Sequence, residues 1–131
     1  MDGGGDARRI TIHRPADFEG MRAAGRLAAE TLDMIVAYVQ PGVTTGALDK
    51  LCHDFIVSHG AVPAPLNYRG FPKSICTSIN HVVCHGIPSD RRLVTGDRIT
   101  LGVADCLCRA GRRSVIGIEE EQLDLLIADD L

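Results

Sequence analysis

The chain's most reactive side chains stand in one short run near its middle. Between Tyr68 and Pro88 lie two histidines, two cysteines and two aromatic residues, set among glycines and prolines. The neighbours Cys84 and His85 suggest the catalytic pair of a thiol protease, in which a histidine activates a cysteine. That interpretation is disfavoured, because adjacent residues of a strand point to opposite faces of the sheet and do not easily form a nucleophile–base contact.

A zinc site is the second chemistry to weigh. The chain has 5 cysteines, an odd number without a CxxC pair, which is typical of reduced thiols in a cytosolic protein. The spacing of the candidate ligands is too irregular for a zinc ribbon. Those candidates are Cys76, Cys84, His85, Cys106 and Cys108.

Helices and strands must hold these side chains in place, and their periodicity predicts an α+β fold. Apolar residues recur at helical spacing before Pro41, and Thr44 or Thr45 can cap a second helix that ends near Gly60. Helices followed by strands predict helices against one face of a mainly antiparallel sheet. The expected elements are helices at 17–40 and 45–59, a Pro-rich loop at 62–72, paired strands at 74–79 and 82–85, a strand at 98–103 and a helix at 118–128.

Length and composition limit the class of protein. A chain of 131 residues predicts one domain, and 45% apolar with 24% charged residues is ordinary for a globular protein. The net charge of -3 disfavours a nucleic-acid partner. No apolar stretch approaches the length of about 20 residues that a membrane span needs, and residues 1–6 lack the apolar core of a signal peptide.

The run from Tyr68 to Pro88 closely resembles a stretch of the type I methionine aminopeptidases. Two further pieces carry the same resemblance, Met21–Glu30 and Val39–Gly46, and together they cover about 10–99. The resemblance implies the N-terminal half of the pita-bread fold, in which two related α/β halves enclose the active site. The expected organisation is a flexible lead at 1–9, the aminopeptidase-like half at 10–99 and a divergent tail at 100–131.

The resemblance also implies an activity: removal of the N-terminal methionine from nascent polypeptides in the cytoplasm. Members of the family use two divalent metal ions, such as manganese, iron or cobalt, which share one water and lower its pKa. Association with the ribosome is left open, and no nucleic-acid or membrane partner is implied.

Four residues take roles by position in the resembled motif. His85 matches a histidine that is not a metal ligand and that hydrogen-bonds the scissile peptide, which makes it the implied catalytic residue. Tyr68 and Phe71 match aromatic residues of the methionine pocket, and Cys76 matches a thiol that lines it. A polarizable sulfur beside aromatic rings suits a thioether. Structural roles stay open as alternatives, namely strand capping for the histidine and core packing for the others.

The resemblance breaks where the metal ligands should begin. The family's first metal-binding aspartate stands five residues past a Gly-Asp pair, and that count from Gly96-Asp97 falls on Gly102. The nearest acid, Asp105, stands three residues after Gly102. A shift by an odd number of residues moves a side chain to the other face of a strand unless a β-bulge intervenes. The second aspartate would fall at Arg113 or Ile116. We therefore expect no metal ligand from this chain, and no bound metal pair in the chain alone.

Three origins for the changed sequence after Ile99 remain open: a frameshifted or rearranged gene, a short variant with its own tail, and a half whose complement is a separate chain. Each is compatible with a truncated, inactive aminopeptidase. A non-catalytic module that binds peptides or a partner is the alternative function, and a fragment without function is the third.

Overall fold

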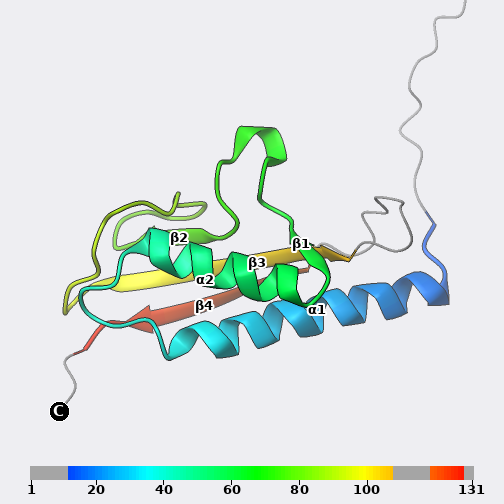
Figure 1. The fold of residues 1–131 in the computed structure, drawn as a ribbon, viewed down its shortest axis with the longest axis horizontal. Helices are drawn as coiled ribbons and strands as arrows, with labels where there is room; N and C mark the ends of the chain where they lie inside the picture. The colour runs from blue at the N-terminus through cyan, green and yellow to red at the C-terminus, as the bar shows by residue number, and fades with distance from the viewer. Residues whose placement is uncertain (1–11, 108–118, 129–131) are drawn as a thin grey trace, which may run out of the picture.

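The computed structural model describes residues 12–107 and 119–128, and in it two helices cover one face of an antiparallel sheet (Figure 1). This arrangement confirms the predicted α+β class. The elements in chain order are α1 (Pro15–Val36), α2 (Thr45–Ser58), β1 (Ala61–Pro63), a 3-10 turn (Tyr68–Gly70), β2 (Cys76–Ile79), β3 (Arg98–Leu107) and β4 (Glu119–Leu126). The expected lead at 1–9 lies outside the described residues. None of the described helices has the length and apolar character that crossing a bilayer requires.

α1 starts two residues before the prediction and ends four residues before it. Pro15 fits the first helical turn because its missing N–H has no partner there in any helix. The Asp17 carboxylate accepts a hydrogen bond from the Arg14 backbone N–H at 2.8 Å, which caps this end. At the other end the hydrogen bonds tighten to three-residue spacing, with the Tyr38 N–H 2.9 Å from the Ile35 carbonyl. The helix has therefore unwound before Pro41 is reached.

α2 matches its predicted bounds to within one residue. The Thr44 hydroxyl accepts a hydrogen bond from the Ala47 N–H at 3.1 Å, so the expected threonine cap is present. Gly60 follows the helix with a φ of 78°, the left-handed conformation that commonly ends a helix. Its N–H donates to the Val57 carbonyl at 3.0 Å. Local sequence signals thus set both ends of this helix.

β3 is the common partner of every other strand, and all pairings are antiparallel. β4 pairs with one edge of β3 over Arg98–Asp105, while β1 and β2 share the other edge. β1 takes the stretch from Asp105 to Leu107, and β2 takes the stretch from Ile99 to Gly102. The chain between β1 and β2 therefore has to leave the sheet and return, and it rises as an arch in Figure 1.

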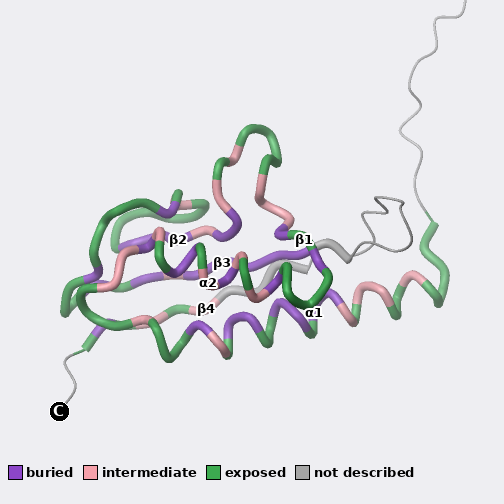
Figure 2. Tube along the Cα trace, viewed as in Figure 1, coloured by how far each residue is buried: buried purple, intermediate pink, exposed green. Residues whose placement is uncertain are grey.

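The core lies between the helices and the sheet, where α1 and α2 pack against the same face. Buried positions are concentrated on the sheet-facing sides of the helices and along β3 (Figure 2). The first turns of α1 extend past the end of the sheet and contain no buried residue before Ala24. The largest fully buried side chains include Ile35, Leu48, Ile56, Ile75, Leu93, Ile99, Leu101 and Val103.

The predicted strand at 82–85 is wrong. Those residues form an irregular loop, and the β2 edge bonds instead to the residue that follows, with the Thr77 N–H 2.8 Å from the Gly86 carbonyl. The apolar pair Val82-Val83 suggested a strand, yet Val83 is 91% exposed. β1 is a second departure, since it occupies the start of the predicted loop at 62–72.

The predicted helix at 118–128 is also wrong, because β4 occupies Glu119–Leu126. The prediction placed Leu126 on the buried side of an amphipathic helix, but this side chain is 66% exposed. Leu123 and Leu125 pack against the core and Ile127 is buried, which is the two-residue period of a strand. The free edge of β3 supplies backbone partners that a helix would leave unused, and this tertiary pairing decides the outcome.

Asp49 joins α2 to the sheet through a buried carboxylate. One of its oxygens accepts hydrogen bonds from the backbone N–H groups of Ser74 and Ile75, at 2.7 and 3.0 Å. These two groups stand just before β2, where the chain returns from the arch. Because buried N–H groups need partners, this contact fixes where the returning chain meets the helix layer.

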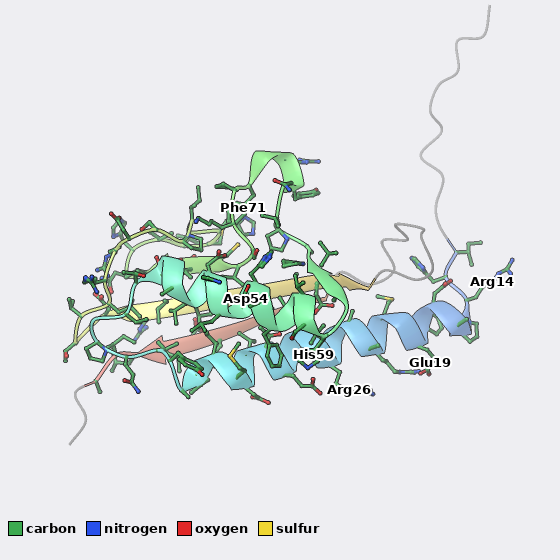
Figure 3. All side chains as sticks on the ribbon, in the orientation of Figure 1. Arg14, Glu19, Arg26, Asp54, His59 and Phe71 are labelled. Atoms are coloured by element: carbon green, nitrogen blue, oxygen red, sulfur yellow. The ribbon has the colours of Figure 1, made fainter. Side chains whose placement is uncertain are left out.

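We predict that Asp49→Ala lowers the free energy of unfolding by roughly 2–4 kcal/mol, since it leaves two buried N–H groups without a partner. Urea denaturation followed by circular dichroism measures the loss. Asp54→Ala is the matched control on the same helix (Figure 3), because Asp54 is exposed and pairs with the exposed Lys50. Equal stability of the two variants would contradict the assignment.

Candidate functional site

One cavity brings together all four residues that the sequence singled out. Tyr68, Phe71, Cys76 and His85 line a hollow of about 630 Å³. They come from three separate segments: the arch, β2 and the loop after β2. Figure 3 shows Phe71 on the arch that rises above the sheet. A volume of this size accommodates a small ligand or one large side chain with its neighbouring backbone.

Backbone hydrogen bonds hold the arch at its first foot, where it leaves the sheet, and at its top. The Ala64 N–H donates to the Ala104 carbonyl at 2.9 Å, which extends the β1 pairing by one residue before the chain lifts off. The Asn67 N–H donates to the Phe71 carbonyl at 2.8 Å, and the Phe71 N–H donates to the Tyr68 carbonyl at 2.9 Å. These bonds close a tight loop that places both aromatic rings beside the cavity.

This tight loop carries unusual backbone geometry. Asn67 and Arg69 have φ values of 63° and 47°, in the left-handed region that costs energy for residues with a side chain. The Arg69 guanidinium lies 5.4 Å from the centre of the Tyr68 ring, within reach of a cation–π contact. Tyr68 remains 60% exposed, so its ring forms the rim of the cavity.

The lining of the cavity is mostly apolar. Sequence reasoning missed Ile87 and Pro65, which line it together with the polypeptide from Gly102 to Ala104. Ile87 was detectable as an apolar residue two positions after His85, whereas the β3 contribution depends on how β1 and β2 divide one edge. Aromatic rings, aliphatic groups and a thiol form a surface suited to an unbranched apolar or thioether side chain.

Two basic side chains, His85 and Arg69, interrupt this apolar lining. His85 is exposed and has a φ of 53°, so a strained backbone presents its imidazole. The next residue, Gly86, allows no side chain, because a Cβ there would lie 2.0 Å from the Thr77 carbonyl oxygen. The close approach of the Gly86 backbone to β2 thus determines where His85 can stand. An imidazole at a cavity wall can donate a hydrogen bond to a ligand.

β3 supplies the floor of the cavity without a functional side chain. Leu101 and Val103 belong to the core on the helix-facing side, so Gly102 lies on the opposite face beside the cavity. The pairing of β3 with β4 runs unbroken through Asp105, and therefore no β-bulge alters the alternation. Asp105 is fully buried on the helix-facing side. This register agrees with the expectation from the sequence that the Asp105 side chain lies on the face of β3 opposite to Gly102.

Two other candidate nucleophiles, Ser74 and Cys52, are too buried to meet a substrate. His53 Nδ1 lies 2.7 Å from the Ser74 hydroxyl, but Ser74 is buried and cannot meet a substrate. Burial, reinforced by the nearby charge of Asp49, raises the pKa of the Cys52 thiol to about 12, which keeps it protonated and unreactive. Cys76 remains the thiol that lines the cavity, while Cys84 is exposed beside His85.

Asp97 organises the base of the loop that carries His85. Its carboxylate accepts two hydrogen bonds from the Arg91 guanidinium, at 2.7 and 3.1 Å. It also accepts from the Asn80 side-chain amide at 3.0 Å and from the Val94 N–H at 2.9 Å. The Arg91 contact, followed by the other two, holds the pKa of this carboxyl well below its usual value. Asp97 is thus a structural residue of the turn before β3.

Comparison with known proteins places this geometry in a family. Residues 19–114 match the model of metallopeptidase family M24, and the chain belongs to that family. It is 66% identical over 94 residues to methionine aminopeptidase of Rickettsia prowazekii (strain Madrid E), a match that covers 72% of this chain and 36% of that protein. Methionine aminopeptidase of Escherichia coli (strain K12) is 57% identical over 96 residues, with the same coverage. The resemblance predicted from the sequence is confirmed, and the chain spans about a third of the length of these relatives.

Solved structures agree with the sequence matches. The crystal structure of the Rickettsia prowazekii methionine aminopeptidase superposes with a TM-score of 0.79 at 51% identity, covering 92% of this chain and 46% of that one. A prolidase from Pyrococcus furiosus superposes with a TM-score of 0.68 at 13% identity, which shows a shared fold alone. The helices and sheet described above therefore correspond to part of the pita-bread fold of family M24.

Metallopeptidases need metal ligands, and the described residues do not fit a metal pair. The position where the resemblance implies the first aspartate is Gly102, and the nearest acid along β3 faces the helices. Within residues 12–107 and 119–128, no three His, Cys, Asp or Glu side chains lie together in an arrangement that could hold a metal ion. The positions considered for the second aspartate, Arg113 and Ile116, lie outside the described residues.

We predict that Asp97→Asn destabilises the protein at neutral pH and that the difference from the wild type shrinks in acid. Because folding lowers the pKa of this carboxyl, its ionised form stabilises the fold at pH values above 3.8, the ordinary pKa of an aspartate. This contribution is lost as the pH falls below 3.8. Melting temperatures between pH 7 and pH 2 measure the effect. Asp90→Asn, an exposed change in the same loop, is the control; a constant difference at all pH values would contradict the assignment.

Proposed function

We propose that this chain carries the methionine-recognition part of a methionine aminopeptidase and binds polypeptides through their N-terminal methionine without cleaving them by itself. The observation that carries the proposal is the convergence of Tyr68, Phe71, Cys76 and His85 on one cavity. The identity of 66% to an aminopeptidase over the same region supports it. Non-catalytic peptide binding, which the sequence left as an alternative, becomes the activity of the chain taken alone.

The cavity suits methionine for physical reasons. A methionine side chain is unbranched, flexible and apolar, and its sulfur makes favourable contacts with the edges of aromatic rings. Phe71 and the rim ring of Tyr68 supply such edges, and Ile87 adds aliphatic surface. A lysine side chain would lose hydration here without gaining an acidic partner among the lining residues, so the cavity selects against lysine.

His85 is placed to act on the peptide bond that follows the bound methionine. Its imidazole lies at the wall of the same cavity, and a donor at this point can hydrogen-bond the carbonyl oxygen next to the methionine. In a complete enzyme the same donor would stabilise the charge that develops on that oxygen during hydrolysis. In this chain its role is to orient the peptide.

Hydrolysis needs more than the described residues supply. In the family, two divalent ions such as manganese, iron or cobalt activate the attacking water. Gly102 has no side chain to bind an ion, and Asp105 is buried on the other face of β3. We therefore infer that the chain alone binds no metal pair and has no peptidase activity. Nascent polypeptides in the cytoplasm, near the ribosome, are the substrates that the complete enzyme would meet.

We predict that a peptide beginning with methionine binds to the chain and that Tyr68→Ala or Phe71→Ala weakens this binding about tenfold, because each removes a large apolar contact. Calorimetric titration with Met-Ala-Ser measures the affinity, and Lys-Ala-Ser tests selectivity. Tyr38→Ala is the matched control, since Tyr38 is the chain's other tyrosine, is exposed and lies away from the cavity. Equal affinity for the two peptides would contradict methionine recognition.

For His85→Ala we expect weaker binding of Met-Ala-Ser with no change in melting temperature, and His81→Ala in the same loop should leave both unchanged. The reason is that, of these two histidines, His85 lines the cavity and His81 does not.

We also expect no methionine release by the wild-type chain in manganese, iron or cobalt. Turnover together with two bound metal ions per chain, measured by elemental analysis, would overturn the inferred inactivity.

A further inference from the structure

We propose that Ser78 is a positioning residue for His85, acting through the backbone of Gly86. The inference rests on the proposed function, in which His85 faces the bound peptide. Ser78 does not line the cavity and was not singled out in the sequence. Its hydroxyl oxygen accepts a hydrogen bond from the Gly86 N–H at 3.1 Å, immediately after His85.

Two hydrogen bonds fix the Gly86 peptide against β2. The second runs from the Thr77 N–H to the Gly86 carbonyl at 2.8 Å, so both the donor and the acceptor of Gly86 are engaged. The backbone contact is so close that a Cβ on Gly86 could not fit. Ser78 is itself buried, which protects its bond from competition by water. A short, rigid anchor therefore stands one residue from the imidazole.

His85 needs this anchor because its own conformation is unfavourable. A φ of 53° costs energy for a residue with a side chain, and the surrounding loop is exposed. Without the Ser78 bond, the peptide between His85 and Gly86 can rotate toward a relaxed conformation. The imidazole would then leave the wall of the cavity while the fold remained intact.

Thr77 provides an internal comparison on the same strand. Its hydroxyl is buried like that of Ser78, yet this oxygen has no hydrogen-bond partner among the described residues. Thr77→Val therefore removes a buried hydroxyl from β2 without touching the Gly86 anchor. Ser78→Ala and Thr77→Val each remove one buried hydroxyl from β2, and only the Ser78 hydroxyl bonds to the loop.

The test combines amide exchange and imidazole spectroscopy by NMR on the full chain. In the wild type, the Gly86 amide should exchange at least tenfold more slowly than the amide of the exposed Val83. In Ser78→Ala, exchange at Gly86 should accelerate about five- to tenfold, the factor that one hydrogen bond contributes, and the His85 ring resonances should shift. Binding of Met-Ala-Ser should weaken by a similar factor. Thr77→Val should change none of these values.

The outcomes separate this inference from the proposed function. Fast exchange of Gly86 in the wild type would overturn the anchor, and this measurement requires no variant to fold. Unchanged His85 resonances in Ser78→Ala would also overturn it, as would equal effects of Thr77→Val. If the wild type binds no Met-Ala-Ser while the NMR differences appear, the proposed function fails and the anchoring of His85 stands.

Discussion

The structure depends on the backbone hydrogen bonding of β3. Each of the other strands pairs with it, and two of them, β1 and β2, divide one edge between them. That division forces the intervening chain out of the sheet as an arch, and the arch carries Tyr68 and Phe71. The loop after β2 returns over the same edge with His85. The cavity is thus a consequence of how strand partners share β3, and local sequence preferences alone would not produce it.

Buried polar contacts then convert this topology into fixed positions. Asp49 ties the returning arch to α2, Asp97 closes the base of the following loop, and Gly86 lies against the β2 backbone. The Asp49 contact joins residues 25 positions apart, and the other two close shorter loops. All three satisfy groups that would be costly to leave alone. The irregular half of the molecule, with its left-handed residues, is held by these few contacts. Apolar packing, by comparison, holds the helices.

The sequence predicted those features that local rules control. The ends of α2, the strand containing Leu101 and the fold class follow from capping residues and periodicity, and the aminopeptidase motif identified the four cavity residues. The sequence mispredicted β4, because Leu123, Leu126 and Ile127 also fit a helix and only the free edge of β3 decides between them. It missed Ser78, whose importance comes from a contact with Gly86 that no spacing rule indicates.

The floor of the cavity is formed by main chain and small residues, Gly102 and Ala104, and its walls come from segments before β3. The shape presented to a ligand therefore depends on small residues at both positions, because a larger side chain on that face of β3 would project into the cavity. Under the proposed function, capture of a polypeptide end relies on the arch and the loop after β2, whereas hydrolysis would need acidic side chains on β3. The two tasks thus depend on different parts of one fold.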